Sequence, residues 1–174
     1  MLSLDARAPL KSNTLATAPR RGIRVQRVAR AWLIAVGVLN GLAGLVCGVL
    51  LIARPDGALL MATALLPVVN ALPFANVFFR DLFWIGAAMI LALGLPNTVA
   101  AVALIRRNAR QYQDALASAV LLMLWSGFEL IYMFNLAAVG YFIVGAVSTL
   151  CALWLLGRPQ EASASQALRA DAAR

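Results

Sequence analysis

Long apolar runs separated by short polar segments make up most of the chain. Residues 32–53 and 82–105 are uncharged, and residues 115–156 contain one charge, Glu129. A membrane core of about 30 Å needs about 20 helical residues, so the last run fits two crossings joined by a turn near residues 135–140. The pattern predicts an all-α, four-transmembrane-helix bundle. Its expected spans are residues 32–53, 82–105, 115–137 and 140–156.

A further apolar stretch lies at residues 55–80 and contains Leu66-Pro67-x-x-Asn70 followed by Leu72-Pro73-x-x-Asn76. Proline interrupts a continuous helix, and only two polar residues separate the stretch from the next span. A fifth span would also place the basic loop at residues 106–110 on the side opposite the basic N-terminus. We therefore expect a hydrophobic extracytoplasmic lid between helices 1 and 2, with a re-entrant hairpin as the alternative.

The distribution of charge assigns the remaining segments. Residues 1–31 form a basic arm, expected to be disordered or interfacial, ahead of a membrane domain at residues 32–157 and a tail at residues 158–174. Four spans put thirteen of the fifteen basic residues on one side, and the positive-inside rule makes that side cytoplasmic. We expect a bacterial cytoplasmic membrane, with both termini cytoplasmic and the arm on anionic lipid headgroups. The Arg- and Ala-containing N-terminus leaves a mitochondrial inner membrane as the alternative.

Composition narrows the chemistry. The chain is 63% hydrophobic and 13% charged with a mean hydropathy of +0.84, which indicates an integral membrane protein. Histidine is absent from the sequence, which removes the usual general base and metal ligand. Catalytic motifs are also missing, so we expect no enzyme, no metal and no cofactor. The basic residues lack interleaved aromatics, so we expect no nucleic-acid partner.

The first span contains glycines at small-xxx-small spacing, which favours close helix packing. These packing residues are Gly37, Gly41, Gly44 and Gly48. In the second span, Pro96 predicts a kink, and Asn97 is expected to hydrogen-bond the backbone groups that the proline disturbs.

Glu129 is the one acidic or basic residue among Asp, Glu, Lys and Arg within the predicted spans. A carboxyl at membrane depth is unfavourable against lipid and by default faces protein or water. One interpretation is a structural hydrogen bond or ion pair; the other is a ligand-binding or proton-carrying group. The candidate binding residues are Glu129, Trp125, Ser126, Tyr132, Arg80, Asn40 and Asn97.

The residues at the start of the second span carry a resemblance. Asp81, Phe83 and Gly86, followed by Gly94 and Asn97, resemble small four-helix bacterial membrane proteins whose second span opens with Asp-x-Phe-x-x-Gly. Such proteins also have a Pro- and Phe-rich outer loop before that Asp and a Trp in the third span, here Trp125. The resemblance implies a four-span topology and a bacterial origin and implies no activity. Small multidrug transporters are also four-helix, Glu-dependent proteins, but their glutamate lies in the first span.

Three hypotheses for function follow. The first is an accessory, scaffold or lipid-binding subunit of a larger membrane complex or homo-oligomer, which suits the basic arm and tight helix faces. The second is an oligomeric carrier that uses Glu129 for proton or cation coupling. The third is a lipid-modifying membrane enzyme.

Overall fold

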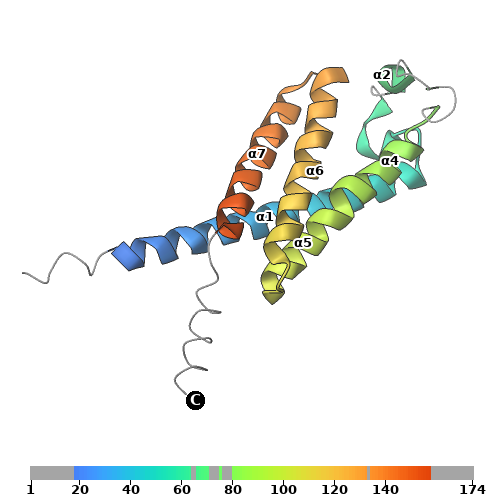
Figure 1. The fold of residues 1–174 in the computed structure, drawn as a ribbon. Helices are drawn as coiled ribbons and strands as arrows, with labels where there is room; N and C mark the ends of the chain where they lie inside the picture. Colours follow the sequence, from blue (N-terminus) through green and yellow to red (C-terminus); the bar gives the residue numbers. More distant parts are fainter. Residues whose placement is uncertain (1–17, 64–65, 71–74, 76–79, 133, 158–174) are drawn as a thin grey trace, which may run out of the picture.

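The computed structural model describes residues 18–63, 66–70, 75, 80–132 and 134–157, and the described part is all-α (Figure 1). Four helical segments are long and apolar enough to cross a membrane. The bounds of these segments are Gly22–Ala53, Phe83–Arg106, Gln111–Tyr132 and Leu136–Leu156. The protein is therefore a four-helix integral membrane protein, as the hydrophobic pattern predicts.

Helix α1 (Ala18–Ala53) begins well before Trp32, so the part of the basic arm that the structure describes is helical. Helix α6 (Gln111–Tyr132) and helix α7 (Leu136–Leu156) form a hairpin. The end of the bundle where α1 finishes and α6 passes into α7 is called the outer end, following the topology predicted from charge.

The second span is built from three pieces. A π-helical turn, η3 (Ile90–Gly94), lies between helix α4 (Phe83–Met89) and helix α5 (Leu95–Arg106). The N–H of Leu95 donates to the carbonyl of Ile90, five residues back, which is the π-helical pattern. Pro96 has no N–H to continue the α-helical ladder. The irregularity therefore lies where the sequence predicted a kink, one turn before the proline.

Two side chains hydrogen-bond the backbone at this irregular turn. Asn97 is 1% exposed, and its Nδ2 donates to the carbonyl of Leu93 at 2.9 Å. Thr98 Oγ1 donates to the carbonyl of Gly94 at 2.8 Å. Asn97 therefore has the role expected from sequence.

The glycines of α1 lie against the second span of the same chain. A Cβ on Gly44 would lie 2.6 Å from the backbone nitrogen of Gly94, and one on Gly48 would lie 2.7 Å from the carbonyl oxygen of Gly86. Gly37 and Gly41 likewise approach residues of α5. The small-residue stripe thus holds α1 close to α4, η3 and α5 and forms the first hairpin of the bundle.

The two hairpins pack together at their inner ends. Ala29 and Leu33 of α1 meet Leu104 of α5, Ala115 of α6 and Leu155 of α7 in one buried cluster. Two polar contacts join the same region. Trp32 Nε1 donates to Ser148 Oγ of α7 at 3.1 Å, and the guanidinium of Arg30 donates to the carbonyl of Leu104. The Arg30 cation thereby stands at the negative end of α5, a favourable place for positive charge.

Towards the outer end the hairpins diverge. Helix α4 packs beside α1, whereas the extensive contacts of α6 are with α7 and α5. In Figure 1 the α6–α7 pair rises away from the α1–α4 pair, so the bundle is closed at the inner end and open at the outer end.

The break between the last two helices lies earlier than the sequence predicted. We expected the third span to reach residue 137 and the fourth to begin at residue 140, but α6 ends at Tyr132 and α7 begins at Leu136. The reason is Asn135, whose Oδ1 accepts the N–H of Ala138 at 2.7 Å and caps α7. Gly140, the first residue of the predicted fourth span, lies within α7.

Asn135→Ala removes this cap, and we expect the free energy of unfolding to fall by about 1 kcal/mol. Thermal unfolding of both proteins in the same detergent, followed by circular dichroism, measures the difference. Asn135→Ser keeps an acceptor and should recover most of the loss; equal losses for Ala and Ser would contradict the capping role.

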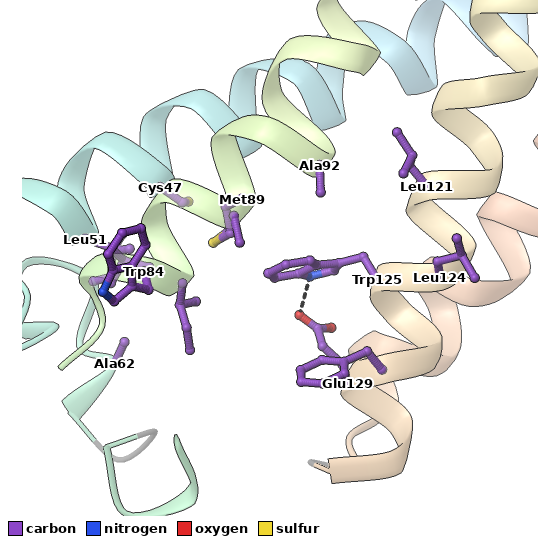
Figure 2. A pocket seen from close by; sticks show the side chains of 14 residues that line it. Cys47, Leu51, Ala62, Trp84, Met89, Ala92, Leu121, Leu124, Trp125 and Glu129 are labelled. Atoms are coloured by element: carbon purple, nitrogen blue, oxygen red, sulfur yellow. Dashed lines mark hydrogen bonds between the residues drawn. The ribbon is translucent and has the colours of Figure 1, made fainter. Parts of the chain in front are cut away.

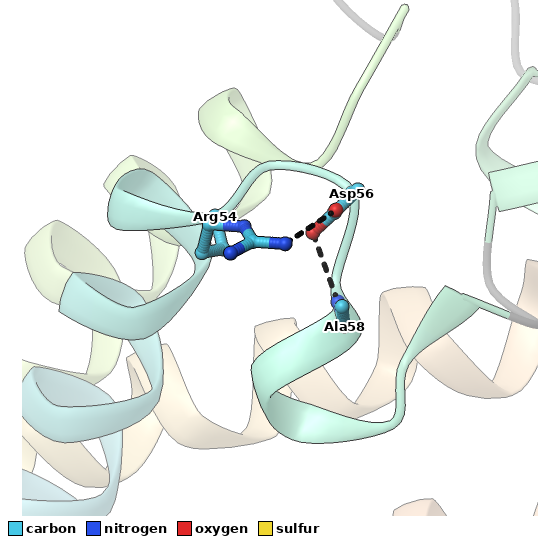
Figure 3. A network of polar contacts seen from close by, with 3 residues as sticks. All are labelled: Arg54, Asp56 and Ala58. Carbon is cyan, nitrogen blue, oxygen red and sulfur yellow. Dashed lines mark hydrogen bonds and ion pairs between the residues drawn. The ribbon is translucent and has the colours of Figure 1, made fainter.

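The described part of the predicted lid begins with a tight turn after α1 (Figure 3). Asp56 Oδ1 accepts the N–H of Ala58 at 3.1 Å, and Arg54 pairs with the Asp56 carboxylate at 3.3 Å. The hydrogen bond from Ala58 is the main reason that the pKa of Asp56 lies below its ordinary value; desolvation opposes this effect, and the hydrogen bond and charge of Arg54 lower the pKa further. Gly57 has φ 72°, and a Cβ there would lie 2.7 Å from Leu82 Cδ1.

The 3-10 turn η1 (Ala58–Leu60) and the short helix α2 (Leu66–Asn70) follow. Val69 of α2 is buried in a cluster with Leu51 of α1 and Leu82 at the start of α4. Residues 64–65, 71–74 and 76–79 of the predicted lid lie outside the described residues. The described parts therefore pack on the outer end of α1 and α4.

Candidate ligand-binding groove

The divergence of the two hairpins creates a groove at the outer end (Figure 2). Its volume is about 660 Å³. Helix α1 contributes its floor, the second span and α6 contribute its two walls, and the segment after α1 contributes its outer edge. The lining residues are Cys47, Leu51, Leu60, Ala62, Trp84, Ile85, Ala88, Met89, Ala92, Leu121, Leu124, Trp125, Phe128 and Glu129.

Thirteen of these fourteen side chains are uncharged and apolar or aromatic, and Glu129 is the exception. The wall on α6 runs from Leu121 to Glu129, a rise of about 12 Å. The opposite wall, from Trp84 to Ala92, spans the same number of residues. The groove is thus an apolar slot with one carboxylate at its outer end.

Trp125 fixes the position of that carboxylate. The indole Nε1 of Trp125 donates to Glu129 Oε1 at 2.7 Å across one turn of α6. Figure 2 shows the indole ring reaching from α6 toward Met89 of the opposite wall, with the carboxylate beside it. Within the part of the chain that the structure describes, no hydrogen bond to the second oxygen, Oε2, is found. One carboxylate oxygen is therefore held by the protein, and the other is available to a guest.

Glu129 lies in the last turn of α6, three residues before its final residue, Tyr132. At 1.5 Å per residue, the carboxyl-bearing Cα is about 4.5 Å from the helix end. The carboxylate accordingly stands at the outer end of the groove, and the groove runs from it toward Leu121 and Ala92.

The other candidate binding residues do not gather around Glu129. Ser126 is fully buried and donates to the carbonyl of Leu122 at 2.6 Å. Asn40 donates to Val36 of its own helix at 3.0 Å, and Asn97 serves the π-helical turn. These three side chains hydrogen-bond backbone carbonyls, and the candidate residue that the structure shows bonded to Glu129 is Trp125.

Tyr132 and Arg80 lie beyond the residues that line the groove. The Tyr132 ring packs on Phe128, with ring centroids 4.7 Å apart, and so borders the groove without entering it. Arg80 is exposed at the end of the loop before α4, and an ion pair between Arg80 and Glu129 stays a prediction. Whether any of these residues binds a ligand also stays a prediction.

Sequence reasoning missed the wall opposite Glu129. Trp84, Ile85, Ala88 and Met89 recur at helical spacing on one face of α4, a signal that the sequence contains. In an apolar span, however, residues that face lipid and residues that face a groove have the same chemistry. Phe128, next to Glu129 in sequence, was missed for the same reason.

The acid and the thiol of the described groove lining lie far apart in sequence. Among the described residues, no group of three His, Cys, Asp or Glu side chains could hold a metal ion. The lining residues include a single acid and a single thiol, Cys47, on different helices.

Comparisons with protein-family models, with curated proteins and with solved structures find no match. Fold and groove therefore define the class, a small four-helix membrane protein, and no family is assigned.

Proposed function

We propose that the protein is a non-enzymatic membrane protein that binds the apolar chain of a lipid-like molecule in the outer groove. The observation that carries this proposal is the groove itself, an apolar slot of about 660 Å³ between the two hairpins. Small-molecule sites have volumes of about 300–1,000 Å³ and are mostly apolar with a few placed polar groups. A groove walled by leucines and aromatic rings suits a hydrocarbon chain.

The exposure of the walls supports entry from the membrane. Trp84 is 49% exposed and Leu124 is 65% exposed, and these residues lie on opposite walls of the slot. Because the slot lies within the spans, a chain dissolved in the bilayer reaches it without crossing water.

The closed inner end favours binding over transport. Below the groove, Leu104 and Leu122 are almost completely buried, and the inner cluster joins all four spans. A carrier using Glu129 would have to open this packed half of the bundle. We therefore rank a coupled carrier below a lipid-binding protein.

We also propose that residues 55–80 cover the outer mouth of the groove as a lid. Leu60 and Ala62 line the groove, and Val69 anchors α2 on Leu51 and Leu82. In this arrangement both termini and the basic arm lie in the cytoplasm of a bacterial cell, and a larger membrane complex or second copy would contact the remaining apolar surface.

Photolabelling tests the proposed site. The protein is reconstituted in phosphatidylcholine nanodiscs and irradiated with a neutral dodecanol derivative that carries a diazirine on its chain. We expect labelled peptides from both groove walls, residues 84–92 and 121–129. Ala88→Trp fills the slot with an indole, and we expect labelling of residues 121–129 to fall about tenfold, the effect of losing roughly 1.4 kcal/mol of binding.

Val99→Trp is the matched control, because Val99 lies on the same span, is 56% exposed and does not line the groove. Its labelling should equal that of the unmodified protein. Uniform labelling of all exposed apolar faces, unchanged by Ala88→Trp, would mean that the groove binds no chain.

A further inference from the structure

We infer that the groove selects an amphiphile whose head is a positively charged amine, with the amine on Glu129 and the chain in the slot. This inference rests on the proposed chain-binding function and names the chemical class of the guest. It also assigns Glu129 and Trp125 as the head-group site.

The carboxylate is presented in a geometry suited to a cation. Trp125 Nε1 donates to Oε1 at 2.7 Å, and Oε2 has no hydrogen bond from the described residues. A carboxylate beside apolar walls gains most from a partner that carries opposite charge and N–H donors. An ammonium head supplies both, whereas an anionic head would be repelled.

Aromatic side chains lie on the helix that carries the carboxylate and on the opposite wall of the groove. Trp125 donates to Glu129, Phe128 precedes Glu129 on α6 and packs on Tyr132, and Trp84 lies on the facing wall. Ring faces attract ammonium groups, and aromatic cages are a recurring means of binding alkylated amines. Neutral and anionic heads gain no comparable attraction.

Charge at the two ends of the bundle also favours a cation at the outer end. In the assigned topology the outer end has three acids, Asp56, Asp81 and Glu129, against two bases, Arg54 and Arg80. The cytoplasmic side has the other thirteen bases and four acids. The outer end therefore has an excess of one negative charge, contributed by Glu129 itself, against an excess of nine positive charges on the cytoplasmic side, so a cation meets less repulsion at the outer end.

The length of the groove suits an amphiphile. Glu129 lies in the last turn of α6, at the outer end of the groove, and the groove continues from it for about 12 Å to Leu121 and Ala92. An amphiphile whose head binds Glu129 thus has the first part of its hydrocarbon chain between the two walls of the groove.

Competition against the photolabel tests the head-group selectivity on the unmodified protein. Dodecylamine, dodecanol and dodecanoate share one chain and differ in the head. We expect dodecylamine to displace the label at a concentration about tenfold lower than dodecanol, because a hydrogen bond between opposite charges raises the affinity by at least about tenfold. Dodecanoate should be the weakest of the three, because its carboxylate is repelled by Glu129.

Glu129→Gln keeps the shape of the side chain and removes its charge. In the same nanodiscs the preference of this variant for dodecylamine over dodecanol should fall to about onefold, while dodecanol still competes with the label. Both competitors partition into the same bilayer whether it holds the variant or the unmodified protein. Partition therefore cancels when the preferences of the two proteins are compared. Glu129→Lys should reverse the order and favour dodecanoate. Trp125→Phe should keep the charge but weaken the preference severalfold.

The two proposals fail in different ways. Equal competition by all three heads on the unmodified protein, with normal groove labelling, overturns the amine site and leaves the chain-binding function standing. Absence of groove labelling overturns both. A preference for dodecylamine that persists in Glu129→Gln shows that the membrane, and not this carboxylate, selects the head, and also overturns the inference.

Discussion

Gly44→Val should lower the free energy of unfolding by about 3 kcal/mol, because the added side chain meets backbone and not a flexible group. A Cβ on Gly44 would lie 2.6 Å from the nitrogen and 2.9 Å from the Cα of Gly94. Neither atom can move without separating α1 from the second span. In a chain of this size the apparent Tm should fall by about 6–12 °C.

Gly140→Val is the matched control, since Gly140 also lies in a membrane helix but no atom lies within 4 Å of a Cβ built there. Both variants gain the same side chain, so propensity effects cancel. Melting curves in one mild detergent, followed by circular dichroism, measure the difference. Equal melting temperatures for the two variants would rule out the close α1–η3 contact.

Asn97→Ala should cost about 2–3 kcal/mol, the second large effect. The variant loses the hydrogen bond from Nδ2 to the carbonyl of Leu93, at 2.9 Å, and leaves a space at a side chain that is almost fully buried. A buried carbonyl without its donor is strongly destabilising, and the π-helical turn has few other donors to offer.

Asn40→Ala provides the comparison for this second variant. Asn40 makes the same bond, to a carbonyl four residues back, at 3.0 Å, but the residue is only partly buried and its helix is regular. We expect a loss below about 1 kcal/mol. Chemical or thermal unfolding of both variants checks the order, and a larger loss for Asn40→Ala would contradict the role assigned to Asn97.

The four spans were predictable because their signal is strong and repeated. Long uncharged runs require membrane helices, and the bounds of the second span agree with the structure within one residue at each end. The role of Asn97 was also predictable, since proline disturbs backbone groups within one turn and an amide side chain next to it can reach them.

The end of the third span was harder to predict, because the predicted turn at residues 135–140 left the boundary open over several residues. The capping side chain of Asn135 decided it, so that α7 begins at Leu136. Glu129 accordingly lies three residues from the end of α6, nearer to the helix end than a span reaching residue 137 would place it.

The partner of Glu129 was among the candidates, whereas the opposite wall of the groove was not. Trp125 lies four residues earlier on the same helix, so local spacing places the two side chains on one face. The facing wall depends on where two hairpins diverge, and that divergence follows from packing between segments far apart in sequence. No local pattern in α4 distinguishes a groove wall from a lipid-facing surface.

The glycine stripe of α1 sets different limits on the residues that can occupy each position of that helix. Gly37, Gly41, Gly44 and Gly48 face backbone or tightly packed atoms, while Leu39 and Leu42 on the other side are more than half exposed. In a library of random variants, the four glycine positions should remain nearly invariant and the exposed positions should exchange freely among apolar residues. Changes at Gly44 should survive chiefly when the facing segment around Gly94 changes with them, so the two helices would vary in concert.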